Sequence, residues 1–367
     1  MPSNANWPRQ RRLPELKHYV RIISACLAIL IYLSIAACSD SNHKPVYRNQ
    51  ILAFGTIVEL TLFDTSDTDG EKLSNEIRLM MEDFHEHWHA WQNSPLTLLS
   101  QTLSQSGQSE INADDAELIS KSLALSNASK GLFHPALGEL ISAWGFHSDE
   151  LPLSPPSEQT INDILNTLPT LDQITITNNV ISNDSGQAIH FDLGGFAKGV
   201  IIDRTIEYLR KAGINNAIVN AGGDLRTIGS AGDRPWRIGI RHPRDLAVFA
   251  SITTRDDESV FTSGDYERYF DYQGKRYHHI IDPRSGYPAD TVSSVTVIHR
   301  DSATADAAAT ALFIAGKQDW PRIAKSMGIE HVMIIDKENK VFITPELAER
   351  MEYEISPPPA VEIHPLP

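Results

Sequence analysis

The chain reads Phe191-Asp-Leu-Gly-Gly-Phe-Ala-Lys-Gly199 immediately before a segment with helical periodicity, Val200–Arg210. In that segment the apolar residues recur at helical spacing, and Gly213 is placed to end the helix. A glycine turn that opens a helix presents unpaired backbone N–H groups and a partial positive charge, which suit an anion such as phosphate. Asp192 can accept a hydrogen bond, and Lys198 supplies a cation. An ordinary strand-to-helix turn is the alternative interpretation.

The first 37 residues have the pattern of a secretory signal peptide of the lipoprotein type. Five basic side chains lie before or at the start of an apolar run, Ile22–Ala37, which is too short to span a bilayer comfortably. The end of this run, Ile35-Ala-Ala-Cys38, resembles the bacterial lipobox. We therefore expect cleavage before Cys38, lipid attached to its sulfur, and a protein anchored to a bacterial cell membrane on the periplasmic side. A short uncleaved anchor is the alternative, and it too places the folded part outside the cytoplasm.

Charge and cysteine content limit the partners and the source of stability. The chain carries a formal charge of −15, and residues 1–37 hold five basic residues and one acid, so their removal would leave −19. Such a charge argues against nucleic acid and against an anionic lipid surface as partners. The second cysteine, Cys26, lies inside the predicted signal, so the mature chain has no possible intramolecular disulfide. Its stability must come from an apolar core.

The chain divides into a signal (1–37), a solvated tether (38–50), one large domain (51–350) and a proline-rich tail expected to be disordered (351–367). Predicted strands and helices intermingle, which indicates the α+β class with mixed or antiparallel sheets, helices and a ligand cleft. The predicted elements are a strand or hairpin arm at 51–63, helices at 71–91 and 114–129 with a cap at Asn112, two short strands around Asn178-Asn179, a strand at 216–228, mostly strands at 236–297, a helix at 303–315 and a short helix at 345–351 capped by Thr344.

One alanine-rich helix offers two oxygen ligands on one face. Ala305-Asp-Ala-Ala-Ala-Thr-Ala-Leu312 places Asp306 and Thr310 one helical turn apart. These hard oxygens suit Mg²⁺, which usually completes its coordination shell with carbonyls, waters and substrate phosphates. A helix cap or a buried hydrogen bond is the alternative role of such a pair.

Five motifs follow one another along the chain: Asp192-Leu-Gly-Gly-Phe-Ala-Lys-Gly199, Asn220-Ala-Gly-Gly-Asp224, Thr262-Ser-Gly-Asp-Tyr-Glu-Arg-Tyr-Phe270, His279-Ile-Ile-Asp-Pro-Arg-Ser-Gly286 and Ala305–Leu312. In this order they resemble the ApbE family of FAD:protein FMN transferases, and the resemblance extends from about Phe54 to about Gly316. It implies that FMN passes from FAD to a Ser or Thr hydroxyl of a target protein, with AMP released and Mg²⁺ as cofactor. The expected acceptor is an exported or membrane-bound protein of an electron-transfer complex.

The resemblance also implies roles for individual residues. The metal ligands would be the carbonyl of Gly195 and the side chains of Asp306 and Thr310, and His279 would be the catalytic base. The implied FAD-contacting positions are Phe54, Trp91, Phe133, His134, Asp192, Lys198 and Ile280. Two of these depart from the family pattern, because Phe54 replaces the usual methionine and His134 replaces the usual aspartate.

Other roles for these polar residues stay open in the sequence. A serine or threonine hydroxyl has a pKa far above neutrality, so its attack needs a base, and histidine titrates near pH 7. His279 is the natural choice, although it also fits a turn histidine, while His278 would point the opposite way on a strand. Ser263 and Asp265 either hold ligand or form a β-turn, and Asp224 either binds or braces its glycine turn.

Two competing functions use the same residues. A Mg²⁺-dependent FAD pyrophosphatase would take water as the acceptor and release FMN and AMP. A non-catalytic FAD-binding lipoprotein would store or present FAD without turnover, and the replacement of the usual acid by His134 favours this alternative slightly.

Overall fold

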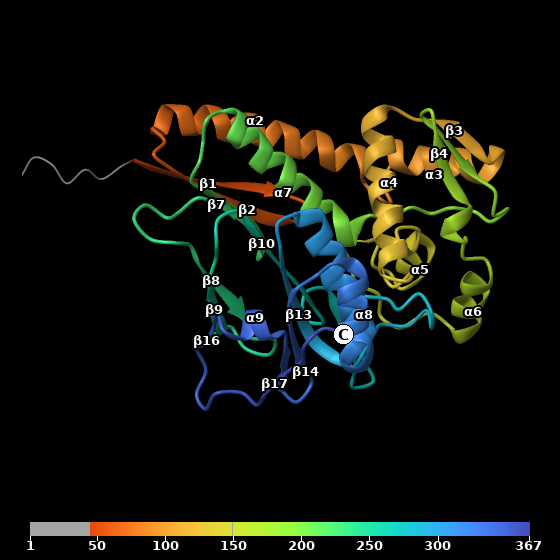
Figure 1. Cartoon of the computed structure of the whole chain (residues 1–367). Helices are drawn as coiled ribbons and strands as arrows, with labels where there is room; N and C mark the ends of the chain where they lie inside the picture. The colour runs from red at the N-terminus through yellow and green to blue at the C-terminus, as the bar shows by residue number, and fades with distance from the viewer. Residues whose placement is uncertain (1–44, 149) are drawn as a thin grey trace, which may run out of the picture. The chain divides into compact units, whose positions relative to one another are not determined.

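The structure is a computed structural model that describes residues 45–148 and 150–367 (Figure 1). The predicted signal, Cys38 and the first part of the predicted tether therefore lie outside the described residues. From Pro45 onward the chain forms one unit. No helix in the part that the structure describes combines the length and the apolar character needed to cross a membrane.

In the described chain, helices and strands occur mostly in separate runs, as in the α+β class. The helices are α2 Asp67–His87, α3 Pro95–Ser106, α4 Ala113–Ala128, α5 Gly138–Ala143, α6 Glu158–Asn166, the 3₁₀ turn η1 Leu171–Gln173, α7 Gly194–Lys211, α8 Ser302–Met327 and α9 Pro345–Ala348. The strands are β1 Val46–Ala53, β2 Thr56–Phe63, β3 Gln108–Glu110, β4 Ile174–Thr177, β5 Val180–Asn183, β6 Ala217–Ala221, β7 Asp224–Ile228, β8 Arg237–Arg241, β9 Val248–Thr253, β10 Glu258–Gly264, β11 Tyr269–Tyr272, β12 Lys275–His278, β13 Val292–His299, β14 His331–Asp336, β15 Val341–Ile343, β16 Met351–Tyr353 and β17 Val361–Ile363.

Within the described residues, nine strands form the main sheet in the order β1-β2-β6-β7-β10-β13-β14-β15-β17. Neighbouring strands run antiparallel except β15 and β17, which are parallel. The central strand β13 reads Val-Ser-Ser-Val-Thr-Val-Ile-His and is buried over nearly its whole length, as a strand covered on both faces should be. Three smaller sheets consist of β11-β12, β16-β9-β8 and β3-β5-β4. The predicted α+β class with mixed or antiparallel sheets is therefore confirmed.

Both ends of the predicted domain extend further than the sequence indicated. Val46–Gln50, assigned to the tether, belongs to β1 because β1 pairs with β2 from Val46 to Ala53 and because Tyr47 is buried. The tail was predicted to be disordered, and this is wrong for two of its segments. Met351–Tyr353 pairs with β9, and Val361–Ile363 adds a parallel strand beside β15. Backbone pairing overrides the proline-rich composition at these positions.

Helices α7 and α8 cross in close contact, and this contact positions the site. A Cβ on Gly199 would lie 2.4 Å from the carbonyl oxygen of Ser302 and 2.5 Å from Cα of Ala303, so only glycine allows the approach. The alanines of α8 between Ala303 and Ala311 are buried and leave room for neighbouring elements. Helix α8 also packs on β10 and β13, while α2 lies beside α7 near β1 (Figure 1).

Several element boundaries differ from those predicted. The 216–228 segment is a hairpin, because Gly222 and Gly223 adopt positive φ angles of 66° and 107° and reverse the chain between β6 and β7. Helix α2 ends at His87, so Trp91 lies in the following loop rather than in the helix. The helix predicted at 303–315 is present, but after a break at Gly316 (φ 67°, ψ −173°) a second helical segment continues to Met327.

Candidate functional site

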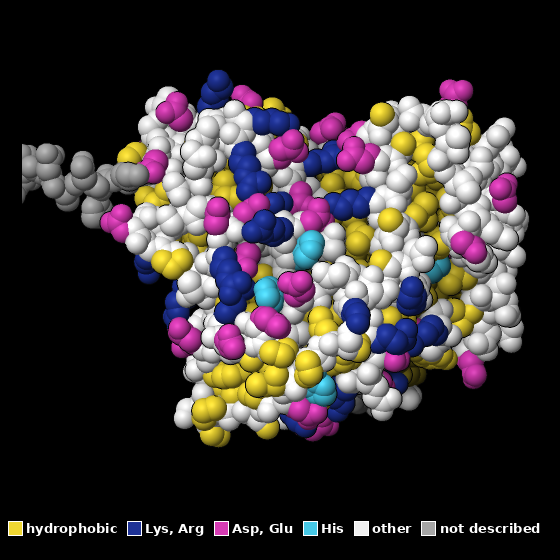
Figure 2. All heavy atoms as spheres, viewed as in Figure 1, with side chains coloured by type: hydrophobic (Ala, Val, Ile, Leu, Met, Phe, Trp, Pro, Cys, Tyr) yellow, Lys and Arg dark blue, Asp and Glu magenta, His cyan; other side chains and the backbone are white. Residues whose placement is uncertain are grey.

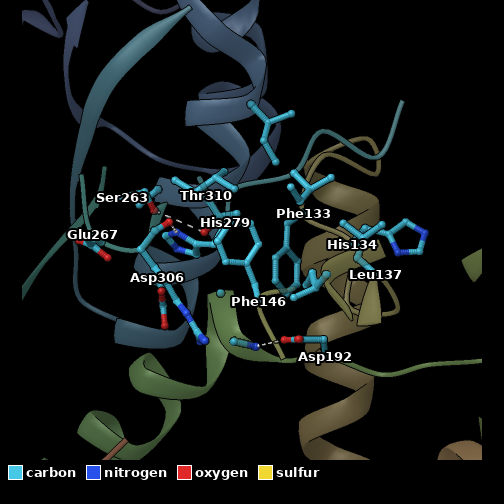
Figure 3. A pocket seen from close by; sticks show the side chains of 18 of the residues that line it. Phe133, His134, Leu137, Phe146, Asp192, Ser263, Glu267, His279, Asp306 and Thr310 are labelled. Carbon is cyan, nitrogen blue, oxygen red and sulfur yellow. Dashed lines mark hydrogen bonds between the residues drawn. The ribbon is translucent and has the colours of Figure 1, made fainter. Parts of the chain in front are cut away.

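A cavity of about 250 Å³ opens where α7, α8, β10 and the segment after β12 meet the α5 region. Most of the predicted site residues line it, although they come from segments far apart in the sequence (Figure 3). The predicted residues found on its wall are Trp91, Phe133, His134, Asp192, Gly195, Lys198, His279, Ile280, Asp306 and Thr310. Phe54 does not line the cavity, and its ring packs edge-on against Phe84 and His85 at centroid distances of 6.1 and 5.4 Å.

The three predicted metal ligands lie together where the start of α7 faces α8. A Cβ on Gly195 would lie only 3.0 Å from Oγ1 of Thr310, which shows how closely these residues approach. Oδ2 of the buried Asp306 accepts a hydrogen bond of 3.0 Å from the backbone N–H of Gly199. In a regular helix that N–H donates to the carbonyl of Gly195, and Gly195 itself departs from helical geometry (φ −84°, ψ 20°). These two features favour a Gly195 carbonyl oxygen that is available to coordinate an added metal ion.

Burial and neighbouring charges set the ionisation of this corner. Burial raises the pKa of Asp306 to about 7, and the nearby Asp224 carboxylate adds to the rise although the Lys198 ammonium opposes it. Burial alone would lower the pKa of Lys198, but the charges of Asp224, Asp306 and Glu267 outweigh that effect and raise it. Lys198 therefore stays protonated and pairs with Asp224. One protonated lysine thus lies among three acidic side chains, Asp224, Asp306 and Glu267, so the binding of a further cation at this corner is electrostatically favoured.

Asp224 and Glu267 are cavity residues that the sequence analysis did not assign to the site. Asp224 is 4% exposed, and its Oδ1 accepts the N–H of Thr262 at 2.9 Å while its other oxygen binds Lys198. Glu267 lines the cavity. Partial exclusion of water from its carboxylate raises the pKa of Glu267 to about 7. Asp224 ends the motif Asn220–Asp224 and Glu267 lies inside the motif Thr262–Phe270, so the motifs themselves contained the signal that would have found both residues.

His279 lies on the cavity wall directly after β12. Its Nδ1 is 3.3 Å from the carbonyl oxygen of Arg268, so that nitrogen can donate and leave Nε2 as an acceptor. Burial lowers the pKa of His279 to about 3, helped by the charges of His278 and Lys198, so the imidazole is neutral at pH 7. A neutral imidazole with a free acceptor nitrogen can take up a proton.

The neighbouring His278 points away from the cavity, as the alternation of a strand predicts. It is 2% exposed, its Nε2 donates to the carbonyl of Ala289 at 2.6 Å, and its Nδ1 accepts the N–H of Ile280 at 3.3 Å. His278 is therefore saturated by backbone groups. Ile280, which follows it by two residues, is buried and lines the cavity as predicted.

The opposite wall is aromatic and includes a histidine that the sequence analysis missed. The ring of His147 stacks on Trp91 at a centroid distance of 4.9 Å and an interplanar angle of 20°. Its Nε2 lies 2.7 Å from Oδ2 of Asp192, whose other oxygen accepts the N–H of Gly194 at 2.8 Å. Trp91 remains 41% exposed, so part of its indole is available to a planar ligand. Phe146, another residue not predicted, adds a buried ring beside His279.

His134 lies at the edge of the cavity, and its ring points away from the centre in Figure 3. Its Nδ1 accepts the N–H of Ala136 at 3.3 Å, and burial lowers its pKa to about 4, so it is neutral at pH 7. Ser263 lines the cavity and its Oγ lies 3.4 Å from Oγ1 of Thr310. Asp265, by contrast, is 1% exposed and binds Arg244 and Lys337 outside the cavity.

The comparison with known families identifies the class of protein that this fold and site define. The model of the ApbE family matches residues 54–333. The chain therefore belongs to the ApbE family. This match covers all five motifs and both helices, α7 and α8, that bring Gly195, Asp306 and Thr310 together.

Known relatives agree with this assignment. The chain is 37% identical over 308 residues to the FAD:protein FMN transferase of Rhodobacter capsulatus, which covers 84% of this chain and 59% of that relative. The chain thus spans about three-fifths of the length of that relative. The crystal structure of the ApbE protein of Thermotoga maritima superposes with a TM-score of 0.75 at 30% identity, over 83% of this chain and 99% of the other. The flavin transferase ApbE of Vibrio cholerae gives 0.73 at 26% identity, over 83% and 100%.

Proposed function

We propose that this protein is an FAD:protein FMN transferase that moves FMN from FAD to a Ser or Thr hydroxyl of another protein. The observation that carries the proposal is the corner where Gly195, Asp306 and Thr310 meet beside Lys198, opposite an aromatic wall. This arrangement pairs a charge-neutralising site for a diphosphate with a surface for a flat ring system. The names of the relatives support the same activity.

The chemistry follows from the positions of the side chains. The acceptor hydroxyl gives its proton to Nε2 of His279 while its oxygen bonds to the phosphorus of the FMN half. The bond between that phosphorus and the oxygen bridging to AMP breaks, and AMP leaves with the bridging oxygen. Lys198 and the start of α7 supply positive potential that neutralises charge on the transferring phosphoryl group. FMN remains attached to the acceptor through a phosphoester.

The donor atoms at the corner fit a Mg²⁺ ion. They comprise one carboxylate, one hydroxyl and one backbone carbonyl, which are the hard oxygens that this ion prefers. Among the described residues no group of three or more His, Cys, Asp or Glu is placed to hold a metal, so the diphosphate and water would have to complete the shell. When bound, the ion would act as a Lewis acid on the diphosphate oxygens. Asp306 would hold it, oriented by the N–H of Gly199.

The aromatic wall supports binding of the flavin half. Trp91 can stack on the isoalloxazine ring, while His147 fixes Asp192 through a hydrogen bond of 2.7 Å. We assign Phe133 and Ile280 to apolar contacts with FAD. We place His134 at the edge of the bound FAD, where its neutral ring can lie beside an apolar group. Phe54, at the turn between β1 and β2, would contact FAD only if that turn moved toward the cavity.

The proposed cellular setting rests on the sequence of the N-terminus. Lipid on Cys38 would hold the protein at a bacterial membrane, on its periplasmic side, where exported or membrane-bound electron-transfer proteins are within reach. This setting suits flavin attachment, because a covalently bound FMN cannot diffuse away from an exported acceptor.

One assay separates the transferase from the pyrophosphatase and the storage protein. The full chain is incubated with FAD, MgCl₂ and a candidate acceptor protein, and AMP and denaturation-resistant flavin fluorescence on the acceptor are measured. AMP with labelled acceptor supports the transferase, AMP with free FMN supports the pyrophosphatase, and bound FAD without AMP supports storage. A parallel reaction in EDTA should stop AMP release, and full activity there would exclude the divalent ion.

A further inference from the structure

A second cavity of about 270 Å³ gathers positive charge on an acidic protein. Its wall contains three arginines, Arg241, Arg244 and Arg276, and two tyrosines, Tyr266 and Tyr269. We call it the arginine pocket. On the face drawn in Figure 2, acidic and basic side chains both occur and are largely interspersed. None of the five residues lines the first cavity.

The three guanidinium groups differ in how well the protein already satisfies them. Arg244 is held by the buried Asp265, with hydrogen bonds of 2.6 and 2.8 Å to its two oxygens. Arg276 lies 3.6 Å from the exposed Asp271 and packs over the ring of Tyr269 at 3.7 Å. Arg241 rests on the ring of Tyr266 at 5.2 Å, and no carboxylate of the described residues forms an ion pair with it.

The pocket therefore presents two arginines with unused hydrogen-bonding capacity beside one that is fixed. Guanidinium groups bind carboxylates and phosphates through paired N–H donors, and stacking on tyrosine holds them in place while leaving those donors free. Asp245 also lines the pocket, but its Oδ1 accepts the backbone N–H of Leu246 at 2.7 Å, and a single carboxylate does not balance the cations. An anion is the ligand that this charge distribution fits.

Neighbouring residues of the same segments line the arginine pocket and the first cavity, which we call the FAD cavity. Tyr266 and Tyr269 line the pocket, whereas Glu267 and Arg268 between them line the FAD cavity, so one short segment separates the two. The β11–β12 hairpin does the same, because Arg276 on β12 faces the pocket and His279 follows two residues after Tyr277 on the FAD side. A chain that brings a hydroxyl to His279 would pass close to the arginines.

We propose that the arginine pocket binds an Asp or Glu side chain of the acceptor protein, close in sequence to the Ser or Thr that receives FMN. This inference rests on the proposed transferase function. A peptide fits better than a free inorganic anion because Leu246, which is 90% exposed, and Pro243 place apolar surface beside the cations. Against a strongly acidic enzyme, an acidic acceptor needs such a local basic contact to approach the site.

The test uses the full-length protein and a synthetic peptide library with one central threonine and random flanking residues. Wild type, the double variant R241Q/R276Q and the control Arg237→Gln are each incubated with FAD, MgCl₂ and the library, and flavin-labelled peptides are identified by mass spectrometry. Arg237 is a suitable control because it lies on the same strand, β8, but outside the pocket, where it pairs with Glu352 and Glu354. FAD binding, followed by flavin fluorescence, should be the same in all three proteins.

The expected result is a preference of wild type and Arg237→Gln for peptides with Asp or Glu near the threonine. The double variant should lose this preference on the order of tenfold, as expected for two partly exposed ion pairs. Labelling by wild type without any acidic preference would overturn the proposal. An unchanged preference in the double variant would overturn it as well.

A binding measurement keeps the inference separate from the transferase function. Fluorescence anisotropy follows a labelled Gly-Asp-Gly-Thr-Gly-Asp-Gly peptide and its Asn counterpart, with inorganic phosphate as competitor. If wild type labels no peptide but the Asp peptide binds R241Q/R276Q more weakly than it binds wild type, the transferase proposal fails while binding of an acidic side chain at the arginine pocket is supported. Binding of phosphate at the arginines without binding of the Asp peptide would instead assign the pocket to a small free anion and overturn the inference.

Discussion

At the residue scale, Asp306 is the side chain on which the proposed activity depends most. It is buried, its Oδ2 is oriented by Gly199, and it lies on the same face of α8 as Thr310. Asparagine keeps the size and one acceptor oxygen but loses the charge that would attract a divalent ion. The effect of this change therefore isolates the charge from the packing.

We expect Asp306→Asn to lower the rate of AMP release at least about 100-fold, because the proposed metal ion would contribute several kcal/mol of charge stabilisation. The fold should persist, as judged by circular dichroism. Asp319→Asn is the matched control, since Asp319 lies on the same helix but half-exposed, and it should keep wild-type turnover. Activity within a fewfold of wild type in Asp306→Asn would remove this carboxylate from the mechanism.

His278 makes the stability of the protein depend on pH. Burial lowers its pKa from 6.5 to about 4, so between these pH values the unfolded chain carries a proton that the folded protein excludes. The free energy of unfolding therefore falls as the pH is lowered through this window, by about 1.4 kcal/mol per pH unit for one such group.

In His278→Asn this contribution is absent, so urea denaturation should show a fall with pH that is shallower by about that slope. The comparison of slopes matters more than the absolute stability, because the variant also loses a buried hydrogen bond to Ala289. Above pH 7 the two proteins should show parallel behaviour. Equal slopes of the unfolding free energy between pH 6.5 and about 4 would mean that His278 takes up a proton as readily in the folded protein as in the unfolded chain.

The residues that line the cavity were predictable to the extent that a motif contains them. Asp192, Lys198 and Asp306 do line one cavity. Their partners were not predictable, because Lys198 pairs with Asp224 and Asp192 with His147 only after distant segments pack together. A sequence pattern reports local spacing, whereas these contacts depend on how segments far apart in the chain pack together.

At the element scale, the crossing of α7 and α8 determines the geometry of the site. Gly199 has no room for a side chain against Ser302 and Ala303, and Gly195 lies one turn earlier beside Thr310. Any atom added at Gly199 must push the two helices apart, and Gly195 on α7 would then move away from Asp306 and Thr310 on α8.

Gly199→Ala should therefore destabilise the protein by about 1–3 kcal/mol, the usual cost of overpacking, and reduce turnover more than Asp319→Asn does. Thermal unfolding and AMP release measure the two effects. Gly239→Ala provides the control, because a Cβ there makes only ordinary contacts with Val248 at 3.4 and 3.5 Å. Wild-type stability and activity in Gly199→Ala would show that the helices can shift without harm.

Secondary structure was predictable where local signals were strong. Helix α4 begins after Asn112, whose side chain accepts the N–H of Asp115, and β4 and β5 turn at Asn178 and Asn179, both with positive φ angles. Helices α3, α5 and α6 were missed, because α3 is rich in Ser and Thr and the other two are short. Tertiary contacts stabilise them, and these do not appear in a local window.

At the scale of the whole molecule, the sheet order could not be predicted from one sequence. β10 pairs with β7 on one side and with β13 on the other, which brings residues around 260 and 296 together. The α+β class itself was predictable, since the predicted strands and helices intermingle in one chain without an internal linker. The end strand β17 was missed because its parallel pairing with β15 has no local signal.

Attachment to the membrane is a prediction about the intact chain. If lipid on Cys38 is the anchor, Cys38→Ser should move the protein from the membrane fraction to the soluble fraction of the cell, as an immunoblot of the fractions can show. Cys26→Ser, inside the predicted signal, should leave the distribution unchanged. A Cys38→Ser protein that stays with the membrane would instead favour the uncleaved N-terminal anchor.

The loop between β8 and β9 has a consequence for how such enzymes diversify. Within residues 242–247, Pro243, Arg244, Asp245 and Leu246 line the arginine pocket, and no residue of this loop lines the FAD cavity. We therefore expect substitutions in the loop to leave the cleavage of FAD unchanged. If the arginine pocket selects the acceptor, substitutions in this loop would change which protein is recognised, while the close contact between α7 and α8 stays the same. Recognition of the acceptor and transfer of FMN could then change independently of each other within a single chain.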